Sequence, residues 1–176
     1  DEESEASFQT LIRMMNSRTY LAPHDPRRKT HLVSDASPCG IAASLYQEDE
    51  QGSWVPVDHT SRALSTYEQG WQSQIDWESL AKTWGMMMFR PYLIGVHFTS
   101  WGDHKPLLPL YNEMTKAAPV RVGRHRNKVQ DLSFTDKYLP GKAMPCDYAS
   151  RHAVPIEGLD EEEKERLMVD TGEDIQ

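Results

Sequence analysis

Four acidic residues most strongly limit what this chain can fold into. They are Asp35, Glu78, Asp103 and Asp147. Three of them stand where a strand or a helix is expected to begin or end, and the fourth lies on an otherwise apolar helix. Carboxylates in such positions are costly to bury unless they are paired or bind cations. A cluster of them suits two divalent metal ions at a phosphate group, so a metal-dependent nuclease is the first hypothesis.

Length and composition favour one folded domain with a hydrophobic core. The chain has 176 residues, of which 38% are hydrophobic, and it contains five tryptophans. No apolar run reaches the roughly 18 residues that a membrane span needs, so we expect no membrane partner. The acidic N-terminal segment is not typical of a secretory signal. The two cysteines, Cys39 and Cys146, form no zinc pattern and fit a reducing compartment, with a disulfide between them as the less favoured alternative.

A net charge of −8 disfavours nucleic-acid binding when it is taken over the whole chain, but the charge is unevenly distributed. Residues 1–5 hold four acids, and residues 157–176 hold nine acids against two bases. Subtracting these ends from the totals of 19 basic and 27 acidic residues leaves 17 and 14, a net charge of +3 for residues 6–156. Bound cations would neutralise the four candidate ligands and make this part effectively cationic. We expect the acidic ends to be solvated and mobile.

Hydrophobic periodicity predicts a mixed α/β arrangement. Strands are expected over residues 30–36, 41–47, 54–60, 96–100 and 132–139, and helices over residues 5–17, 66–89 and 121–132, with short helices after Asp103 and from Asp147. Residues 20–29 are expected to be a linker. The apolar stripe of the long helix should leave Glu78 partly buried where that helix meets the sheet. Taken singly, Asp35 is compatible with a turn residue, and Asp103 and Asp147 with helix caps.

Seven short blocks carry a resemblance to a known family. They are Ser34-Asp-Ala-Ser37, Ser61-Arg-Ala-Leu64, Glu78-Ser-Leu-Ala81, Phe89-Arg-Pro-Tyr-Leu-Ile-Gly95, Gly102-Asp-His-Lys-Pro-Leu107, Tyr138-Leu-Pro-Gly-Lys142 and Cys146-Asp-Tyr-Ala-Ser-Arg151. In this order and spacing they resemble the ribonuclease H domain of gypsy-type (Metaviridae) LTR retrotransposon Pol polyproteins. Three positions depart from that family's pattern: Ser34 and Gly102 replace threonines, and Tyr148 replaces an alanine.

The resemblance implies a ribonuclease H-like α/β fold, a five-stranded mixed sheet with helices on both faces. It implies two Mg²⁺ ions, with Mn²⁺ as a substitute, about 4 Å apart at the scissile phosphate. Asp35 would bridge the two ions, Glu78 and Asp103 would complete one site, and Asp147 would complete the other. The activity implied is hydrolysis of the RNA strand of RNA/DNA hybrids during reverse transcription. The fold also agrees with the rule that sites in open α/β sheets lie beyond the carboxyl ends of strands.

Substrate contacts are expected around the proposed metal site. The turn over residues 37–40, which begins at Ser37, can offer backbone groups to the RNA strand, and Lys105 and Arg151 lie near enough to steer phosphate. A basic helix can contact the phosphates of the DNA strand through Arg121, Arg124, Arg126 and Lys128. The alternative for this helix is a solvated charged face. His104 is expected to be a loop residue rather than a catalytic one.

The resemblance also implies how the chain is organised. Residues 1–29 would be a helix and linker from the reverse transcriptase side, residues 30–152 the ribonuclease H domain, and residues 153–176 a mobile acidic tail. The expected partners are the hybrid and the reverse transcriptase of the same polyprotein, inside a cytoplasmic virus-like particle. A non-catalytic, connection-type scaffold is the alternative. An integrase or transposase would need a further glutamate well downstream of Asp103. That alternative is disfavoured, because no glutamate lies between Glu113 and Glu157.

Overall fold

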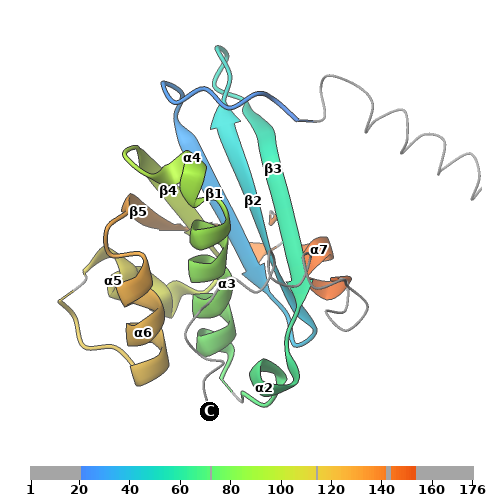
Figure 1. Cartoon of the computed structure of the whole chain (residues 1–176), viewed down its shortest axis with the longest axis vertical. Helices are drawn as coiled ribbons and strands as arrows, with labels where there is room; N and C mark the ends of the chain where they lie inside the picture. The colour runs from blue at the N-terminus through green and yellow to red at the C-terminus, as the bar shows by residue number, and fades with distance from the viewer. Residues whose placement is uncertain (1–20, 72, 114, 142–143, 154–176) are drawn as a thin grey trace, which may run out of the picture.

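The computed structural model describes residues 21–71, 73–113, 115–141 and 144–153 (Figure 1). The helix expected over residues 5–17 and the acidic tail from residue 154 lie outside the described residues. Residues 21–29, expected to be a linker, form neither helix nor strand. No helix in the described ranges is both long enough and apolar enough to cross a membrane. Cys39 and Cys146 are both free thiols, so the alternative of a disulfide between them is wrong.

Five strands form one mixed sheet, which confirms the predicted fold class. The strands are β1 (Thr30–Ala36), β2 (Gly40–Glu48), β3 (Trp54–Ala63), β4 (His97–Gly102) and β5 (Ser133–Tyr138), in the order β3-β2-β1-β4-β5. The first three strands form an antiparallel meander, whereas β4 runs parallel to β1 and β5 runs parallel to β4. The central strand β1 therefore has an antiparallel neighbour on one side and a parallel neighbour on the other (Figure 1).

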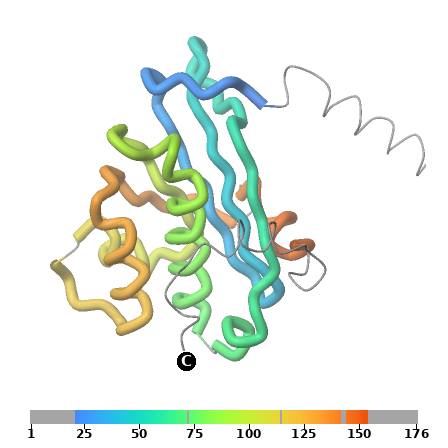
Figure 2. Tube along the Cα trace, viewed as in Figure 1, coloured from blue at the N-terminus to red at the C-terminus, as the bar shows by residue number. Residues whose placement is uncertain are grey.

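Helices cover both faces of the sheet, as the burial of β1 requires. Successive side chains of a strand point to opposite faces, yet Leu32 and Val33 are both fully buried. Leu32 belongs to a large cluster beneath α3 (Gln74–Met88), with α5 (Leu108–Asn112) and α6 (Val120–Lys128) packed beside that helix. Val33 packs with Ala42, Met144 and Cys146 on the other face, where α7 (Asp147–Arg151) lies (Figure 2).

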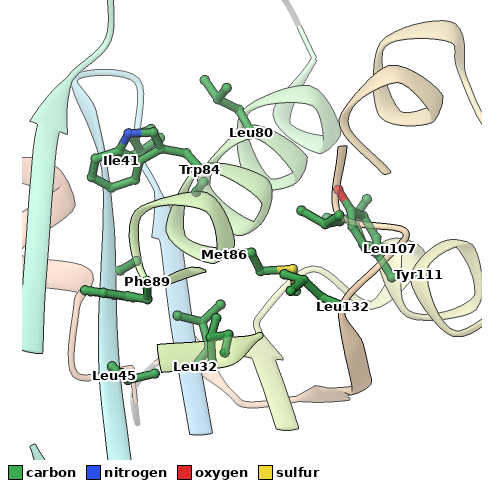
Figure 3. Packing of buried hydrophobic residues seen from close by; sticks show 14 of the residues in the cluster. Leu32, Ile41, Leu45, Leu80, Trp84, Met86, Phe89, Leu107, Tyr111 and Leu132 are labelled. Atoms are coloured by element: carbon green, nitrogen blue, oxygen red, sulfur yellow. The ribbon is translucent and has the colours of Figure 1, made fainter. Parts of the chain in front are cut away.

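Helix α3 packs unusually close to the sheet, and this close packing sets the position of the side chains of α3 relative to the sheet. A Cβ atom added at Gly85 would stand 2.6 Å from the Cβ of Ala43, so only glycine allows this approach. Trp84 and Met86 flank Gly85 and fill the space around it, with Leu32 and Ile41 supplied by the sheet (Figure 3). Since Glu78 lies two turns before Gly85, the same contact sets the height of that carboxylate above the sheet.

The single helix predicted over residues 66–89 is wrong, because the chain forms two helices there. The first is α2 (Thr66–Gln69), with a capping box between Ser65 and Glu68 and a C-cap at Gly70. The Glu68 carboxylate also accepts two hydrogen bonds of 2.7 Å from the buried guanidinium of Arg62. These fixed partners hold α2 at the end of β3, so it cannot continue straight into α3. Apolar periodicity alone does not detect such an interruption.

The other boundaries differ from the predictions by a few residues. Strand β3 continues to Ala63, three residues further than expected, and α6 ends at Lys128 instead of residue 132. Helix α3 ends at Met88, and a separate short helix, α4 (Arg90–Leu93), carries Pro91 in its first turn. Proline there ends one helix and fits the start of the next, since its missing N–H is not needed in a first turn.

Candidate metal centre

Three carboxylates meet at one end of the sheet. Asp35 lies near the end of β1, and Asp103 directly follows β4, so the two come from the carboxyl ends of adjacent parallel strands. Glu78 reaches them from the second turn of α3. One oxygen of each carboxylate lies within 4.8 Å of one oxygen of each of the others. We call Asp35, Glu78 and Asp103 the carboxylate trio. The pairing of β1 with β4 brings Asp35 and Asp103 together, and the packing of α3 on the sheet adds Glu78.

The environment of Glu78 and Asp35 disfavours negative charge on their carboxyl groups. Burial raises the pKa of Glu78 to about 8, and the nearby carboxylates of Asp103 and Asp35 contribute to the increase. Burial also raises the pKa of Asp35, against the effect of a hydrogen bond from Ser150, while the charges of Asp103 and Asp147 raise it further. Glu78 is only 4% exposed. Glu78 and Asp35 therefore cannot both be ionised without a large cost unless positive charge joins them.

The surroundings of one Asp103 carboxylate oxygen bear on cation binding. Its Oδ1 is buried and has no hydrogen-bond partner among the described residues. The reading of Asp103 as a helix cap is wrong, because the N-cap of the following 3₁₀ helix η1 (Lys105–Leu107) is His104. A buried carboxylate oxygen without a hydrogen-bond donor is costly, so this oxygen suits a cationic partner. A divalent cation is the partner that the surrounding carboxylates suit best.

The raised pKa of Glu78 predicts how stability depends on pH when cations are chelated. Folding raises this pKa from 4.5 to about 8, so the protonated form favours the folded state. The contribution of Glu78 is therefore complete below about pH 4.5 and is lost as the pH rises through about 8. We expect the free energy of unfolding in EDTA to fall over this range by on the order of a few kcal/mol.

Urea unfolding between pH 5 and pH 9 checks this expectation with Glu78→Gln, which copies the protonated side chain. The variant should gain stability over the wild type at pH 8 to 9 and show a flatter pH dependence. Some slope should remain, because the pKa of Asp35 is raised as well. The exposed Glu50 in the β2–β3 loop supplies the control, Glu50→Gln. Parallel curves for the wild type and Glu78→Gln would contradict the expectation.

Asp147 lies beside the trio but has a different partner. It is the first residue of α7, as predicted, and its Oδ1 accepts hydrogen bonds from Nη2 of Arg151 at 2.8 Å and from Nε at 3.0 Å. The guanidinium lowers the pKa of Asp147, and 43% of the Asp147 side chain is exposed. Its charge is near enough to raise the pKa of Asp35. The structure thus brings three of the four predicted ligands together and holds the fourth next to them in an ion pair.

The trio fits a hard divalent cation. Mg²⁺ and Mn²⁺ prefer oxygen ligands, and Mg²⁺ usually takes only a few carboxylates because it retains several waters. Asp35, Glu78 and Asp103 offer such oxygens. Oδ1 of Asp103, which has no hydrogen-bond partner among the described residues, is the atom where a bound cation would stabilise the site most. Displacement of Arg151 from Asp147 would add a fourth carboxylate. The donor set therefore agrees with the metal chemistry predicted from the sequence.

The residues predicted to bind nucleic acid fall into two groups. Lys105, Arg124 and Arg151 lie on the surface, and Lys128 is partly buried. The other three make internal contacts. Arg121 donates a hydrogen bond of 2.6 Å to Asp76, and Arg126 donates to the carbonyl oxygens of Leu110 and Lys116, each at 2.9 Å.

Ser37 is the third residue with internal contacts. Its side chain is buried and donates a hydrogen bond of 2.8 Å to the carbonyl oxygen of Ser150. The ion pair and carbonyl contacts of Arg121 and Arg126 likewise hold α6 in the fold. In the arrangement observed, Arg124, Lys105 and Arg151 are the basic side chains best placed to meet a substrate.

Two features near the trio were missed in the sequence. Ser150 donates a hydrogen bond of 2.6 Å to Oδ2 of Asp35, although it is 115 positions away. Lys82, one turn after Glu78, is buried and forms an ion pair of 2.5 Å with Asp136 on β5. The sequence did hint at the buried charges of the ion pair, since Lys82 and Asp136 interrupt apolar positions of a helix and a strand. It did not indicate that these two residues contact each other.

The strand order, the covering helices and the carboxylate trio define a ribonuclease H fold with a candidate metal site. Residues 1–100 match the family described as the RNase H-like domain found in reverse transcriptase. The chain belongs to this family. It is 31% identical over 141 residues to the retrovirus-related Pol polyprotein from transposon 412 of Drosophila melanogaster, and 32% identical over 154 residues to that from transposon opus.

These relatives are gypsy-type retrotransposon polyproteins, which confirms the resemblance drawn from the seven blocks. The alignments cover 80% and 86% of this chain but only 11% and 15% of the two polyproteins. The chain thus corresponds to a small part of each relative. The activities of the complete polyproteins are therefore not assigned to this chain by the similarity alone.

Two solved structures show the same fold. The prototype foamy virus protease-reverse transcriptase superposes with a TM-score of 0.56 at 15% identity, over 80% of this chain and 19% of that one. LC11-RNase H1, crystallised in complex with an RNA/DNA hybrid, gives a TM-score of 0.52 at 12% identity, over 72% of this chain and 96% of that one. At such low identity the likeness concerns the fold alone.

Proposed function

We propose that this chain is a metal-dependent ribonuclease H that hydrolyses the RNA strand of RNA/DNA hybrids during reverse transcription. The observation that carries the proposal is the carboxylate trio, in which one oxygen of each residue lies within 4.8 Å of the others and one buried oxygen has no donor among the described residues. Such an arrangement is costly for a protein that only needs to fold. The family of the chain supports the same reading.

Each acidic residue has a role in the proposal. Asp35, Glu78 and Asp103 would hold a divalent cation, and Asp147 would hold a second one in place of its ion pair with Arg151. Bound Mg²⁺ or Mn²⁺ would supply activation of a water molecule and stabilisation of the leaving oxygen. The released guanidinium of Arg151 would then be placed to bind a phosphate of the substrate. The fixed strand ends and the depth of α3 keep the carboxylates oriented.

Recognition of the hybrid is proposed to rely on shape and backbone charge. A ribonuclease H distinguishes its substrate by the 2′-hydroxyl groups of one strand and by the minor groove, without reading bases. Lys105 and Arg151 are exposed near the trio and suit phosphates close to the cut, whereas Arg124 on α6 suits a more distant phosphate. Binding should therefore weaken with added salt.

The proposed context is a retroelement polyprotein. Residues 30–152 would form the ribonuclease H unit, residues 1–29 would lead into it from the reverse transcriptase, and residues 153–176 would be an acidic extension. The reverse transcriptase of the same polyprotein and the hybrid would be its partners, in a cytoplasmic virus-like particle. The similarity to transposon Pol polyproteins supports this assignment.

Cleavage of a labelled hybrid tests the proposal. The RNA strand is labelled at its 5′ end and annealed to DNA, and the chain is added with Mg²⁺ or with excess EDTA. We expect cuts in the RNA of the hybrid with Mg²⁺ only, and no cuts in duplex RNA or duplex DNA of the same sequence. Cutting that persists in EDTA, or equal cutting of duplex RNA, would contradict it.

One observation favours a second candidate, a scaffold that binds hybrids without cutting them. Arg151 neutralises Asp147 within the protein, which leaves three carboxylates for cations in the arrangement observed. If this pair persists when cations bind, the second cation would lack a ligand. Hybrid binding without cleavage in both Mg²⁺ and Mn²⁺ would support the scaffold over the nuclease.

A further inference from the structure

A buried serine joins the last helix to the carboxylate trio. The hydroxyl of Ser150 on α7 donates a hydrogen bond of 2.6 Å to Oδ2 of Asp35 on β1. Ser150 is fully buried, so water does not compete for this bond. The same hydroxyl also lies 2.9 Å from the carbonyl oxygen of Asp147. A serine hydroxyl has one proton, and a carboxylate attracts it more strongly than a carbonyl does.

A second serine holds the first in place. The hydroxyl of Ser37, in the turn that follows β1, donates a hydrogen bond of 2.8 Å to the carbonyl oxygen of Ser150. Ser37 in turn accepts hydrogen bonds of 3.1 Å from the backbone N–H groups of Cys39 and Gly40. The backbone and the side chain of Ser150 are thus both tied to β1 and its turn.

Glycine at position 40 makes this contact possible. A Cβ atom added at Gly40 would stand 2.8 Å from the carbonyl oxygen of Ser150 and 2.6 Å from the Cβ of Ala153. Both distances are shorter than real Cβ contacts, so any other residue would push α7 away from the turn. The chain therefore brings α7 to one particular depth, at which the hydroxyl of Ser150 reaches Asp35.

We propose that Ser150 is a positioning residue that orients the Asp35 carboxylate for cation binding, and that Ser37 and Gly40 seat Ser150 for this task. An ionised carboxylate can accept at about four lone-pair sites, so one bond from Ser150 fixes its rotation and leaves room for cations. Ser150 also lies three residues after Asp147 on the same short helix. The contact therefore sets how far Asp147 stands from Asp35. This inference rests on the proposed function of the trio as a cation site.

Calorimetric titration of the 176-residue chain with Mg²⁺, and separately with Mn²⁺, tests the proposal without substrate. Three variants are compared with the wild type: Ser150→Ala, Ser37→Ala and the control Ser44→Ala. Ser44 is a buried serine on β2 whose hydroxyl lies 2.8 Å from His59, so its loss removes a buried hydroxyl without touching Asp35. Thermal unfolding in EDTA measures the stability cost of each change.

We expect Ser150→Ala to weaken cation binding at least about tenfold, the range seen when the partners that orient metal ligands are removed. Ser37→Ala should weaken it less, and Ser44→Ala should leave it unchanged even where it lowers the melting temperature as much. Equal affinities for Ser150→Ala and Ser44→Ala would overturn the positioning role. Should Ser150→Ala not fold, an unchanged affinity in Ser37→Ala would overturn the proposal.

The same titrations separate this inference from the proposed function. A wild type that cuts the hybrid while Ser150→Ala binds Mg²⁺ normally would leave the nuclease intact and remove the positioning role. A wild type that binds cations but does not cut would refute the nuclease, and the variants would still decide the role of Ser150. A wild type that binds neither cation would refute both.

Discussion

Replacing Asp103 with Asn is expected to lower Mg²⁺-dependent cleavage of an RNA/DNA hybrid by at least about a hundredfold. A bound metal contributes several kcal/mol to stabilising charge in a transition state, and each 1.36 kcal/mol corresponds to a factor of ten in rate. Asp103 supplies the buried oxygen that lacks a donor within the described residues, so its charge has no other evident use. Asparagine keeps the size and one oxygen of the side chain but removes the negative charge.

The reason for choosing Asp103 is that its loss should not harm the fold. Like charges close together destabilise the trio in the absence of metal, and Asp103 raises the pKa of both Glu78 and Asp35. The variant should therefore melt in EDTA at a temperature equal to or above that of the wild type. In Mg²⁺ the order should reverse, because only the wild type gains stability from bound cations.

A matched aspartate far from the site serves as the control. Asp131 is exposed and pairs with Arg90, and exposed ion pairs contribute little to stability. Asp131→Asn should cleave the hybrid within about twofold of the wild type, since exposed pairs contribute at most about 1 kcal/mol to stability and Asp131 is not a predicted cation ligand. Cleavage by Asp103→Asn at the rate of this control would remove the nuclease assignment.

The parts of the site that the sequence could predict are those set by strand topology. Asp35 and Asp103 follow apolar strand patterns, and the ends of neighbouring parallel strands must meet. Glu78 was identifiable because a carboxylate on an apolar helix needs a partner. Periodicity, a local property of the chain, places these residues on their strands and helix. That the two strands are parallel neighbours was predicted from the family resemblance.

The parts that the sequence could not predict are those in which a side chain has several possible hydrogen-bond or ion-pair partners. Asp147 takes Arg151 from its own helix, a choice between an intramolecular ion pair and a cation that the order of residues does not decide. The bond from Ser150 to Asp35 requires the depth of α7, which is set by Gly40. Likewise, the break between α2 and α3 follows from the partners of Glu68, to which apolar periodicity is blind.

Replacing Lys82 with Met is expected to destabilise the chain by about 3–5 kcal/mol, the usual cost of breaking a buried ion pair on one side. The Lys82 side chain is 3% exposed. Its Nζ donates a hydrogen bond of 2.5 Å to Oδ1 of Asp136 and one of 2.9 Å to Oγ of Ser100. Asp136 is as deeply buried, and its Oδ2 has no hydrogen-bond partner among the described residues. Methionine fills a similar volume, so the loss would come from an uncompensated charge rather than from a cavity.

The double variant Lys82→Met/Asp136→Leu separates charge from packing. Removing both partners of a buried pair is often neutral or stabilising, so the double variant should recover most of the stability lost in Lys82→Met. The two changes should therefore be strongly non-additive in a double-mutant cycle measured by urea unfolding in EDTA. Additive losses would show that the pair does not act as a unit.

The buried pair is also linked to the carboxylate trio, because Lys82 lowers the pKa of Glu78. Cation binding by the Lys82→Met variant should therefore require a higher pH or a higher Mg²⁺ concentration than binding by the wild type.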